Sequence, residues 1–171
     1  MERTGVITFA GNPLTLVGDE VRVGDKAPPF TVVDKELKPV SLSDFQGKIK
    51  LISVTPSLDT PVCDLQARTF NQEAAALPDT IVVLNISMDL PFAIARFCSS
   101  AGIEKIETLS DYKDASFGTA YGVLIKELRL LSRSIFVIDQ KDIITYVEMV
   151  PEITKAPNYD KALSEAKKLV G

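Results

Sequence analysis

The chain contains two cysteines, Cys63 and Cys98, and no histidine. Without an imidazole, neither a Ser-His-Asp triad nor a Cys-His pair can be assembled. A metal site would have to be built from carboxylates and two distant sulfurs, so we expect no metal. The sequence also lacks the glycine-rich motifs GxGxxG and GxxxxGK, so no bound cofactor is indicated. Chemistry is therefore expected first at the two thiols.

The spacing of the two cysteines excludes a CxxC redox pair and a zinc knuckle. A chain of 171 residues, 46% of them hydrophobic, can bury a core large enough to fold without a disulfide. The residues alone leave three interpretations of these cysteines open, namely two buried apolar thiols, one structural disulfide, or a pair that carries chemistry.

Cys63 falls in the first turn of a helix that we expect over about 61–77. Thr60 is a good N-cap and Pro61 a favoured first residue. The free N–H groups and the helix dipole favour a thiolate there. The loop from Pro56 to Pro61 is stiff enough to hold a reactive group at the end of a strand. The helical spacing also places the sulfur on an apolar stripe, as in a core cysteine, with Ala67, Phe70, Ala74 and Leu77.

The elements that must position these thiols alternate between strand and helix. We expect strands over 6–9, 14–17, 30–33, 49–54, 80–87, 106–109, 134–138 and 143–150, a turn or single helical turn over 41–45, and helices over 61–77, 91–101, 115–121 and 158–170. Strand–helix–strand order predicts a parallel centre, and the late hairpin adds an antiparallel edge. The predicted fold class is α/β, a thioredoxin-like fold with a central mixed sheet flanked by helices and an N-terminal β-hairpin extension. No repeat or linker divides the chain, so we expect one domain over 1–171.

Charge and hydropathy exclude several other classes of protein. The net charge is −4, whereas a nucleic-acid binder usually carries a basic excess. No run of 18 apolar residues occurs, so we expect no membrane span. The first residues lack the basic and apolar blocks of a secretory signal. These features predict a cytoplasmic protein without nucleic-acid partners.

Pro56, Thr60 and Cys63 together form the pattern P-x-x-x-T-x-x-C, which resembles that of the peroxiredoxins. The similarity is closest to their thiol peroxidase subfamily, the atypical two-cysteine enzymes of bacteria. It extends over nearly the whole chain, through 8–13, 24–28, Arg68, Phe70, Asn71, 87–93, 96–98, 121–123 and 137–139.

The resemblance implies a thiol-dependent peroxidase acting on hydrogen peroxide and small organic hydroperoxides. Cys63 would be the peroxidatic nucleophile, becoming a sulfenic acid, and Cys98 would resolve it to an intramolecular disulfide. A thioredoxin-type reductant would then restore both thiols. The resemblance also implies a homodimer and no cofactor.

Three further residues receive roles from the resemblance. Pro56 would shield the sulfur, and Thr60 would hydrogen-bond the thiolate and the substrate oxygen besides capping the helix. Arg133 fits the family's distant arginine, whose guanidinium would stabilise the thiolate and polarise the peroxide. The alternative for Arg133 is a solvated surface charge, with rival cations at Arg68, Arg96 and Arg129.

Two features depart from the family pattern. Asp64 follows the nucleophile where the family often has a small residue, and we expect the helix to turn its carboxylate away from the sulfur. The stretch 124–132 lacks the glycines expected in the loop before Arg133. The resemblance therefore defines the placement of Arg133 less closely than that of Cys63.

Three rival functions use the same residues. A peroxide sensor would pass its disulfide to a partner protein instead of turning over many equivalents of peroxide. A dithiol–disulfide oxidoreductase would need a CxxC at the helix start, where Thr60 occupies the first position. A structural thioredoxin-fold module would carry inert thiols.

Cys98 lies near the end of its own predicted helix, four residues before Gly102. It shares an apolar stripe with Ile94, Phe97 and Ala101, so we expect its thiol to pack inward in the reduced protein. Because the two cysteines follow different strands, we expect their sulfurs not to touch until part of the structure unwinds.

Overall fold

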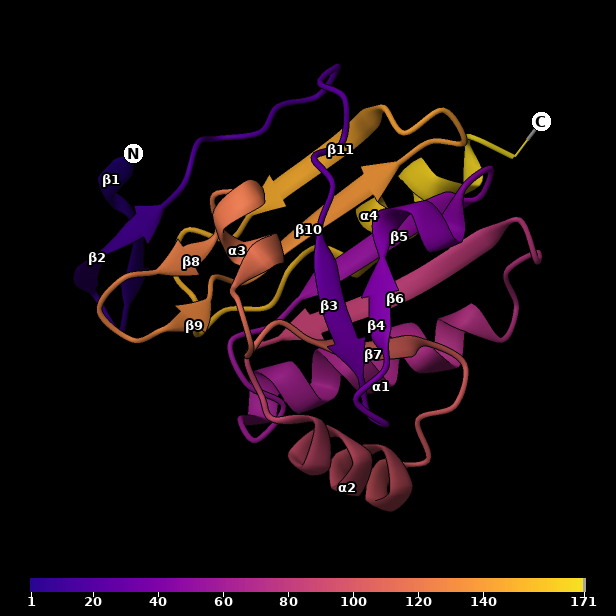
Figure 1. The fold of residues 1–171 in the computed structure, drawn as a ribbon, viewed down its shortest axis with the longest axis horizontal. Helices are drawn as coiled ribbons and strands as arrows, with labels where there is room; N and C mark the ends of the chain where they lie inside the picture. The colour runs from indigo at the N-terminus through magenta and orange to yellow at the C-terminus, as the bar shows by residue number, and fades with distance from the viewer. Residues whose placement is uncertain (171) are drawn as a thin grey trace.

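The computed structural model describes residues 1–170, and Figure 1 shows its arrangement. The strands are β1 (Glu2–Phe9), β2 (Asn12–Val17), β3 (Thr31–Asp34), β4 (Pro39–Ser41), β5 (Ile49–Val54), β6 (Ile81–Ser87), β7 (Glu107–Ser110), β8 (Leu124–Ile125), β9 (Leu130–Leu131), β10 (Ser134–Ile138) and β11 (Ile144–Met149). The helices are the 3₁₀ helix η1 (Leu42–Phe45), α1 (Pro61–Ala74), α2 (Pro91–Ala101), α3 (Ser116–Ala120) and α4 (Tyr159–Lys167).

The main sheet has seven strands in the order β11-β10-β5-β6-β7-β3-β4. The strands β5, β6 and β7 run parallel, and β10 pairs antiparallel with β5. This parallel centre with antiparallel flanks is the predicted thioredoxin-like arrangement. The carboxyl ends of β5 and β6 therefore open at one edge of the sheet, where the loops leading into α1 and α2 begin.

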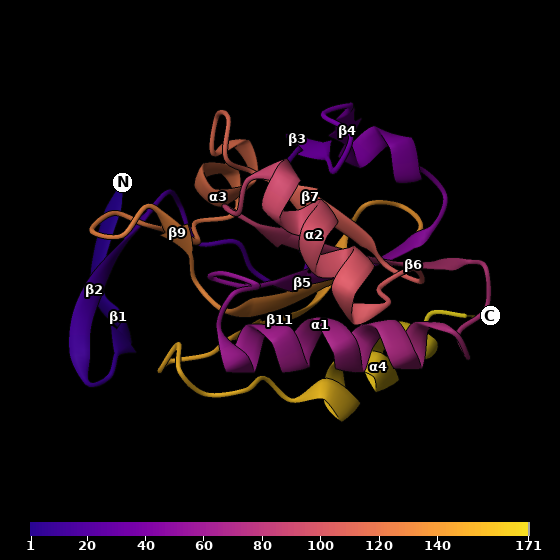
Figure 2. The ribbon, with the colours of Figure 1, turned by 90° about the horizontal axis from the view of Figure 1, so that it is seen from below.

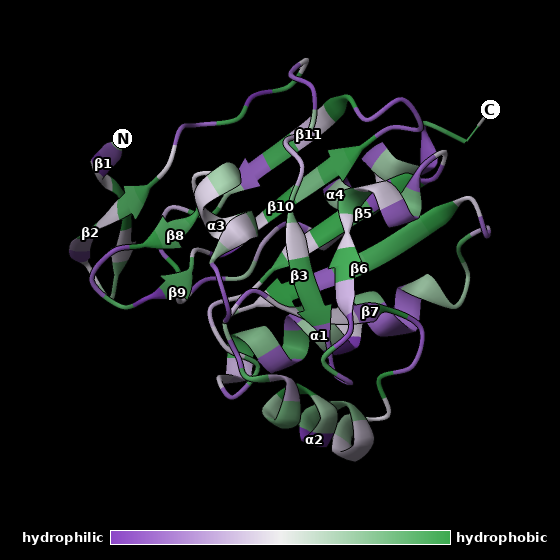
Figure 3. Cartoon of the chain, in the orientation of Figure 1, coloured by the Kyte–Doolittle hydropathy of each residue, from purple (hydrophilic) through white to green (hydrophobic). Residues whose placement is uncertain are grey.

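Two hydrophobic cores lie on opposite faces of the main sheet. On one face the sheet packs against α1, α2 and α4, and on the other against α3 and η1. Figure 2 shows α1 and α4 on one side of the sheet and α3 on the other. Hydrophobic residues predominate along β5, β6 and β10 because these central strands are covered on both faces (Figure 3).

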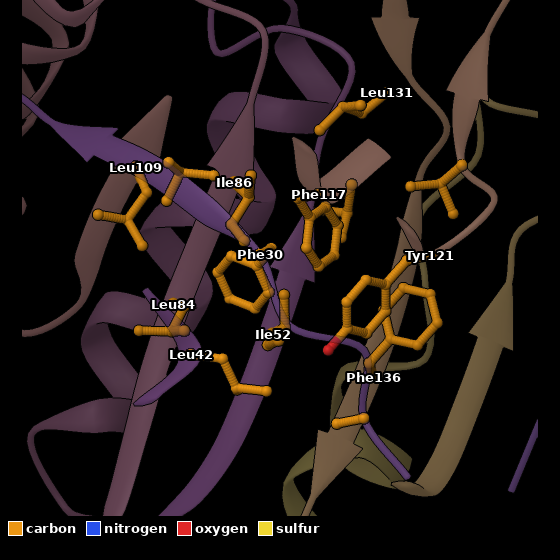
Figure 4. Close-up of a cluster of buried hydrophobic side chains, with 14 of the residues drawn as sticks. Phe30, Leu42, Ile52, Leu84, Ile86, Leu109, Phe117, Tyr121, Leu131 and Phe136 are labelled. Carbon is orange, nitrogen blue, oxygen red and sulfur yellow. The ribbon is translucent and has the colours of Figure 1, made fainter. Parts of the chain in front are cut away.

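Aromatic rings fill the core beneath α3 (Figure 4). Phe117 stacks on Tyr121 with ring centroids 4.4 Å apart, and Phe30 meets Phe117 edge-on at 5.2 Å. The Tyr121 hydroxyl donates to the carbonyl of Pro28 at 2.9 Å, so its buried polar atom has a partner. Burial raises the pKa of this tyrosine, which therefore stays protonated.

A second, four-stranded sheet has the order β1-β2-β8-β9. The hairpin β1–β2 is the predicted N-terminal extension. The pair β8–β9 was not predicted from the sequence, because its strands have two residues each. Arg129 adopts a left-handed φ of 54° in the turn between them, which explains how this loop forms without the expected glycine.

The helix ends also differ slightly from the predicted ones. We expected the first helix to reach Leu77, but α1 ends at Ala74, three residues earlier. Beyond Ala74 the chain continues in tighter turns, in which Ala76 donates to the carbonyl of Glu73 and Leu77 to that of Ala74, and Pro78 disfavours helical backbone at Leu77. Within residues 1–170, no helix is long and apolar enough to cross a membrane.

Candidate active site

The loop after β5 carries Cys63 into the first turn of α1. Asp89, from the loop after β6, fastens this segment, because its carboxylate accepts from the Ser57 hydroxyl at 2.7 Å and from the Leu58 N–H at 2.8 Å. The two loops at the carboxyl ends of the parallel strands are thus tied together. Cys63 follows this anchored loop and is fully buried, with an exposed fraction of 0%.

Arg133 lies directly against the Cys63 sulfur. Its Nη2 donates to the Sγ of Cys63 at 3.2 Å, its Nη1 to Gln66 at 2.9 Å, and its Nε to the carbonyl of Ile153 at 3.0 Å. The side chain is 2% exposed. Within residues 1–170 it forms no ion pair with a carboxylate. A buried cation without a carboxylate favours an anionic group beside it, and the Cys63 sulfur is the atom in that place.

The rival arginines do not contact this sulfur. Arg68 pairs with Asp64 one helical turn away on the outer side of α1, and half of its side chain is exposed. Arg96 and Arg129 are exposed. The pairing with Arg68 also confirms that the Asp64 carboxylate turns away from Cys63.

An apolar pocket of about 190 Å³ reaches Arg133 from the surface. Its lining includes Pro56, Thr60 and Val62 from the segment around the start of α1, together with Phe9 and Ile153. Phe9 is the last residue of β1, so the N-terminal hairpin forms one wall of the pocket. This contribution is not predictable from the sequence, because Phe9 and Cys63 are distant in the chain.

Thr60 differs in one detail from its predicted role. It precedes α1 with extended backbone, as an N-cap does, but its side chain makes no capping hydrogen bond. The hydroxyl donates instead to the carbonyl of Ser57 at 2.9 Å, and among residues 1–170 no hydrogen bond joins it to Cys63. Thr60 is one of the residues that line the pocket, and its hydroxyl oxygen keeps a lone pair that can accept a hydrogen bond.

Cys98 is buried on the inner side of α2, as predicted, with an exposed fraction of 4%. Its Sγ lies 3.1 Å from the hydroxyl oxygen of Thr108 on β7. Both cysteines are free thiols, and each sulfur has its own polar partner. The two sulfurs are therefore not joined by a disulfide in this structure.

Comparison with known proteins identifies the family. A sequence profile of the Redoxin family matches residues 22–163. A thiol peroxidase of Halalkalibacterium halodurans is 60% identical over 161 residues, which are 94% of this chain and 96% of that protein. One from Bacillus subtilis is 58% identical, covering 96% of this chain and 98% of the relative. The chain belongs to the thiol peroxidase family of peroxiredoxins.

A solved structure agrees with this membership. The crystal structure of a peroxiredoxin-like protein from Aquifex aeolicus superposes with a TM-score of 0.91 at 40% sequence identity, and covers 98% of both chains. The fold is therefore the thioredoxin-like fold of the peroxiredoxins. As a family member, the chain is an enzyme, a thiol-dependent peroxidase.

Gln66 is a buried residue of this peroxidase that the sequence analysis missed. It accepts from Arg133, and its Nε2 donates to the Ser53 hydroxyl on β5 at 2.7 Å. The guanidinium is thus fixed from the sheet through one amide. The signal in the sequence was a polar residue three positions after Cys63, but only the packing of α1 on β5 gives it a partner.

Glu152 joins the pocket wall to the rest of the enzyme. Its carboxylate accepts from the hydroxyl of Thr8 at 2.8 Å, from the N–H groups of Ala10 and Gly11 at 3.1 and 2.9 Å, and from Thr154. These bonds hold the tip of the hairpin β1–β2 beside Ile153, whose carbonyl holds Arg133. They also hold the pKa of Glu152 well below its usual range.

Replacing Glu152 with glutamine should weaken the attachment of the hairpin tip and reduce the pH dependence of the free energy of unfolding. A carboxyl group whose pKa is lowered in the folded state stabilises that state above its unfolded pKa of about 4.3, and this stability is lost as the pH falls further. Urea unfolding between pH 7 and pH 3 should therefore show a shallower acid loss of stability for Glu152→Gln than for the wild type. Amide exchange at 8–11 should also quicken in the variant, and equal acid profiles would contradict this role.

Proposed function

We propose that this enzyme reduces hydrogen peroxide and organic hydroperoxides through a sulfenic acid on Cys63. The observation that carries the proposal is the buried Arg133, which donates to the Cys63 sulfur and has no carboxylate partner within residues 1–170. The guanidinium favours the thiolate, which is the nucleophilic form of cysteine. The apolar pocket that reaches Arg133 suits the alkyl part of an organic hydroperoxide.

In the first step, the Cys63 thiolate attacks the terminal oxygen of the peroxide. The O–O bond breaks, Cys63 becomes a sulfenic acid, and the leaving oxygen departs as an alkoxide or hydroxide that takes up a proton. Arg133 stabilises the charge that develops on that oxygen. Thr60 has committed its proton to Ser57, so its oxygen accepts the hydrogen bond of the incoming hydroperoxide. Pro56 covers the sulfur and limits water near it.

In the second step, Cys98 attacks the sulfur of the sulfenic acid. A Cys63–Cys98 disulfide forms, and the sulfenic hydroxyl leaves as water with the thiol proton. A thioredoxin-type protein then reduces the disulfide by thiol–disulfide exchange, and its own two thiols become a disulfide. We further propose that the chain forms one domain and works as a cytoplasmic homodimer without nucleic-acid partners.

Counting thiols tests the proposal directly. One equivalent of peroxide should remove two free thiols per chain, and peptide mass mapping should find Cys63 linked to Cys98. With thioredoxin, its reductase and NADPH present, many equivalents of peroxide should be consumed per chain. Consumption that stops at one equivalent, with the disulfide passed to another protein, would favour a peroxide sensor.

Oxidation should loosen the two helices that carry the cysteines. The sulfurs are held by different partners, so a disulfide requires the first turn of α1, the helix α2, or both to unwind. Such local opening leaves the rest of the fold intact. Amide exchange in 59–66 and 92–101 should be faster in the oxidised than in the reduced protein, with β5, β6 and β10 unchanged. Equal exchange in both redox states would contradict local unwinding.

A further inference from the structure

The contact between Cys98 and Thr108 links the second cysteine to the sheet. The Sγ of Cys98 and the Oγ1 of Thr108 are 3.1 Å apart, and the two residues are 4% and 6% exposed. Around them, Ile94 on α2 and Ile103 and Ile106 in the segment between α2 and β7 belong to the same buried apolar cluster. The hydroxyl is thus the polar partner of a thiol that is otherwise enclosed by hydrocarbon.

Thr108 is also the last member of a polar row across the sheet. Ser53, Asn85 and Thr108 are register neighbours on the parallel strands β5, β6 and β7. The Ser53 hydroxyl donates to Asn85 at 3.2 Å and accepts from Gln66, which accepts from Arg133. One end of the row therefore supports the arginine at Cys63, and the other end holds Cys98.

This placement has a consequence for disulfide formation. To reach Cys63, the Cys98 sulfur must leave the face of β7, and the contact with the Thr108 hydroxyl must break. A buried hydrogen bond of this kind stabilises the closed position and so makes opening rarer. While the sulfenic acid waits, a second peroxide can oxidise it to a sulfinic acid, which the disulfide no longer rescues.

We propose that Thr108 is a positioning residue of the resolving step. Its hydroxyl retains Cys98 in the buried position and so sets how the Cys63 sulfenic acid divides between disulfide and sulfinic acid. The inference rests on the proposed roles of the two cysteines. The step that Thr108 regulates is the attack of Cys98 on the sulfenic sulfur, which forms the S–S bond and releases water.

Thr108→Val keeps the shape of the side chain and removes the hydroxyl, and Thr108→Ser keeps the hydroxyl. Thr15→Val is a matched control, because Thr15 is 7% exposed, lies on β2 and has its hydroxyl 3.3 Å from that of Thr4. For each protein, rapid mixing with hydrogen peroxide and acid quenching gives the rates of sulfenic acid and disulfide formation. Mass spectrometry under turnover gives the sulfinic fraction at Cys63 as peroxide rises.

In Thr108→Val the disulfide should form about threefold to tenfold faster, as expected for the loss of one hydrogen bond. Sulfinic acid should then need a correspondingly higher peroxide concentration, while the rate of the first oxidation stays unchanged. Thr108→Ser and Thr15→Val should behave as the wild type does. A disulfide rate in Thr108→Val that is unchanged or slower overturns this proposal alone. A wild type that forms no Cys63–Cys98 disulfide overturns the proposed function and this proposal with it.

Discussion

Replacing Cys63 with serine should abolish peroxidase turnover, lowering it by at least about a thousandfold. A serine hydroxyl at this position stays protonated at neutral pH, so no anion is present to attack the O–O bond. The rate of peroxide consumption with thioredoxin, its reductase and NADPH measures the effect. The variant should keep its fold, because serine is smaller than cysteine and still accepts a hydrogen bond from Arg133.

Cys98→Ser is the matched control for this experiment. With one equivalent of peroxide per chain it should form the Cys63 sulfenic acid at the wild-type rate, because Cys63 and Arg133 are intact, but no intramolecular disulfide. Turnover that persists in Cys63→Ser would show that Cys63 is not the nucleophile. Loss of the first equivalent in Cys98→Ser would instead show that the order of the two cysteines is reversed.

Replacing Arg133 with alanine should slow the oxidation of Cys63 by about a hundredfold to a thousandfold. The loss combines a smaller thiolate fraction with weaker stabilisation of charge on the leaving oxygen, and removing one such donor has effects of this size in other enzymes. The second-order rate constant with hydrogen peroxide measures both. The rate of alkylation by iodoacetamide, which does not involve the leaving oxygen of a peroxide, measures the thiolate fraction alone.

Arg133→Ala should also cost stability, because Gln66 and the carbonyl of Ile153 lose a buried donor, at about 1–3 kcal/mol for each unsatisfied group. Urea unfolding therefore has to accompany the kinetics. Arg68→Ala is the control, since Arg68 lies on the outer side of α1 and pairs with Asp64 in partial exposure to water. An Arg133→Ala enzyme that is folded and reacts at the wild-type rate would exclude the guanidinium from the chemistry.

The two substitutions break the same contact between Cys63 and Arg133 but remove different groups. Cys63→Ser removes the nucleophile and leaves the cation with Gln66 and Ile153. Arg133→Ala leaves the nucleophile and removes the charge that holds it as an anion. The first variant should therefore be inactive and stable, and the second slow and less stable.

Much of the fold follows from patterns local in the sequence. The strands β5 and β10 and the helix α2 have the predicted bounds, because predominantly apolar strand segments and a proline-to-glycine helix pattern are recognisable from neighbouring residues. The first-turn position of Cys63 follows in the same way from Pro61. The pattern of Pro56, Thr60 and Cys63, together with Cys98 in its Arg-Phe-Cys element and the similarity over nearly the whole chain, indicates the peroxiredoxins.

The sequence alone thus determined the order of the longer strands and helices, the class of fold and the cysteine at the start of α1, but not the short strands β4, β8 and β9. Only the tertiary structure decided which arginine meets the sulfur, that Phe9 forms a pocket wall, that the Thr60 hydroxyl turns to Ser57, and that Thr108 holds Cys98. The physical reason is the range of the interactions involved. Helix starts and strand runs depend on neighbouring residues, whereas Arg133, Phe9 and Thr108 acquire their partners only when distant strands pair and helices pack across them.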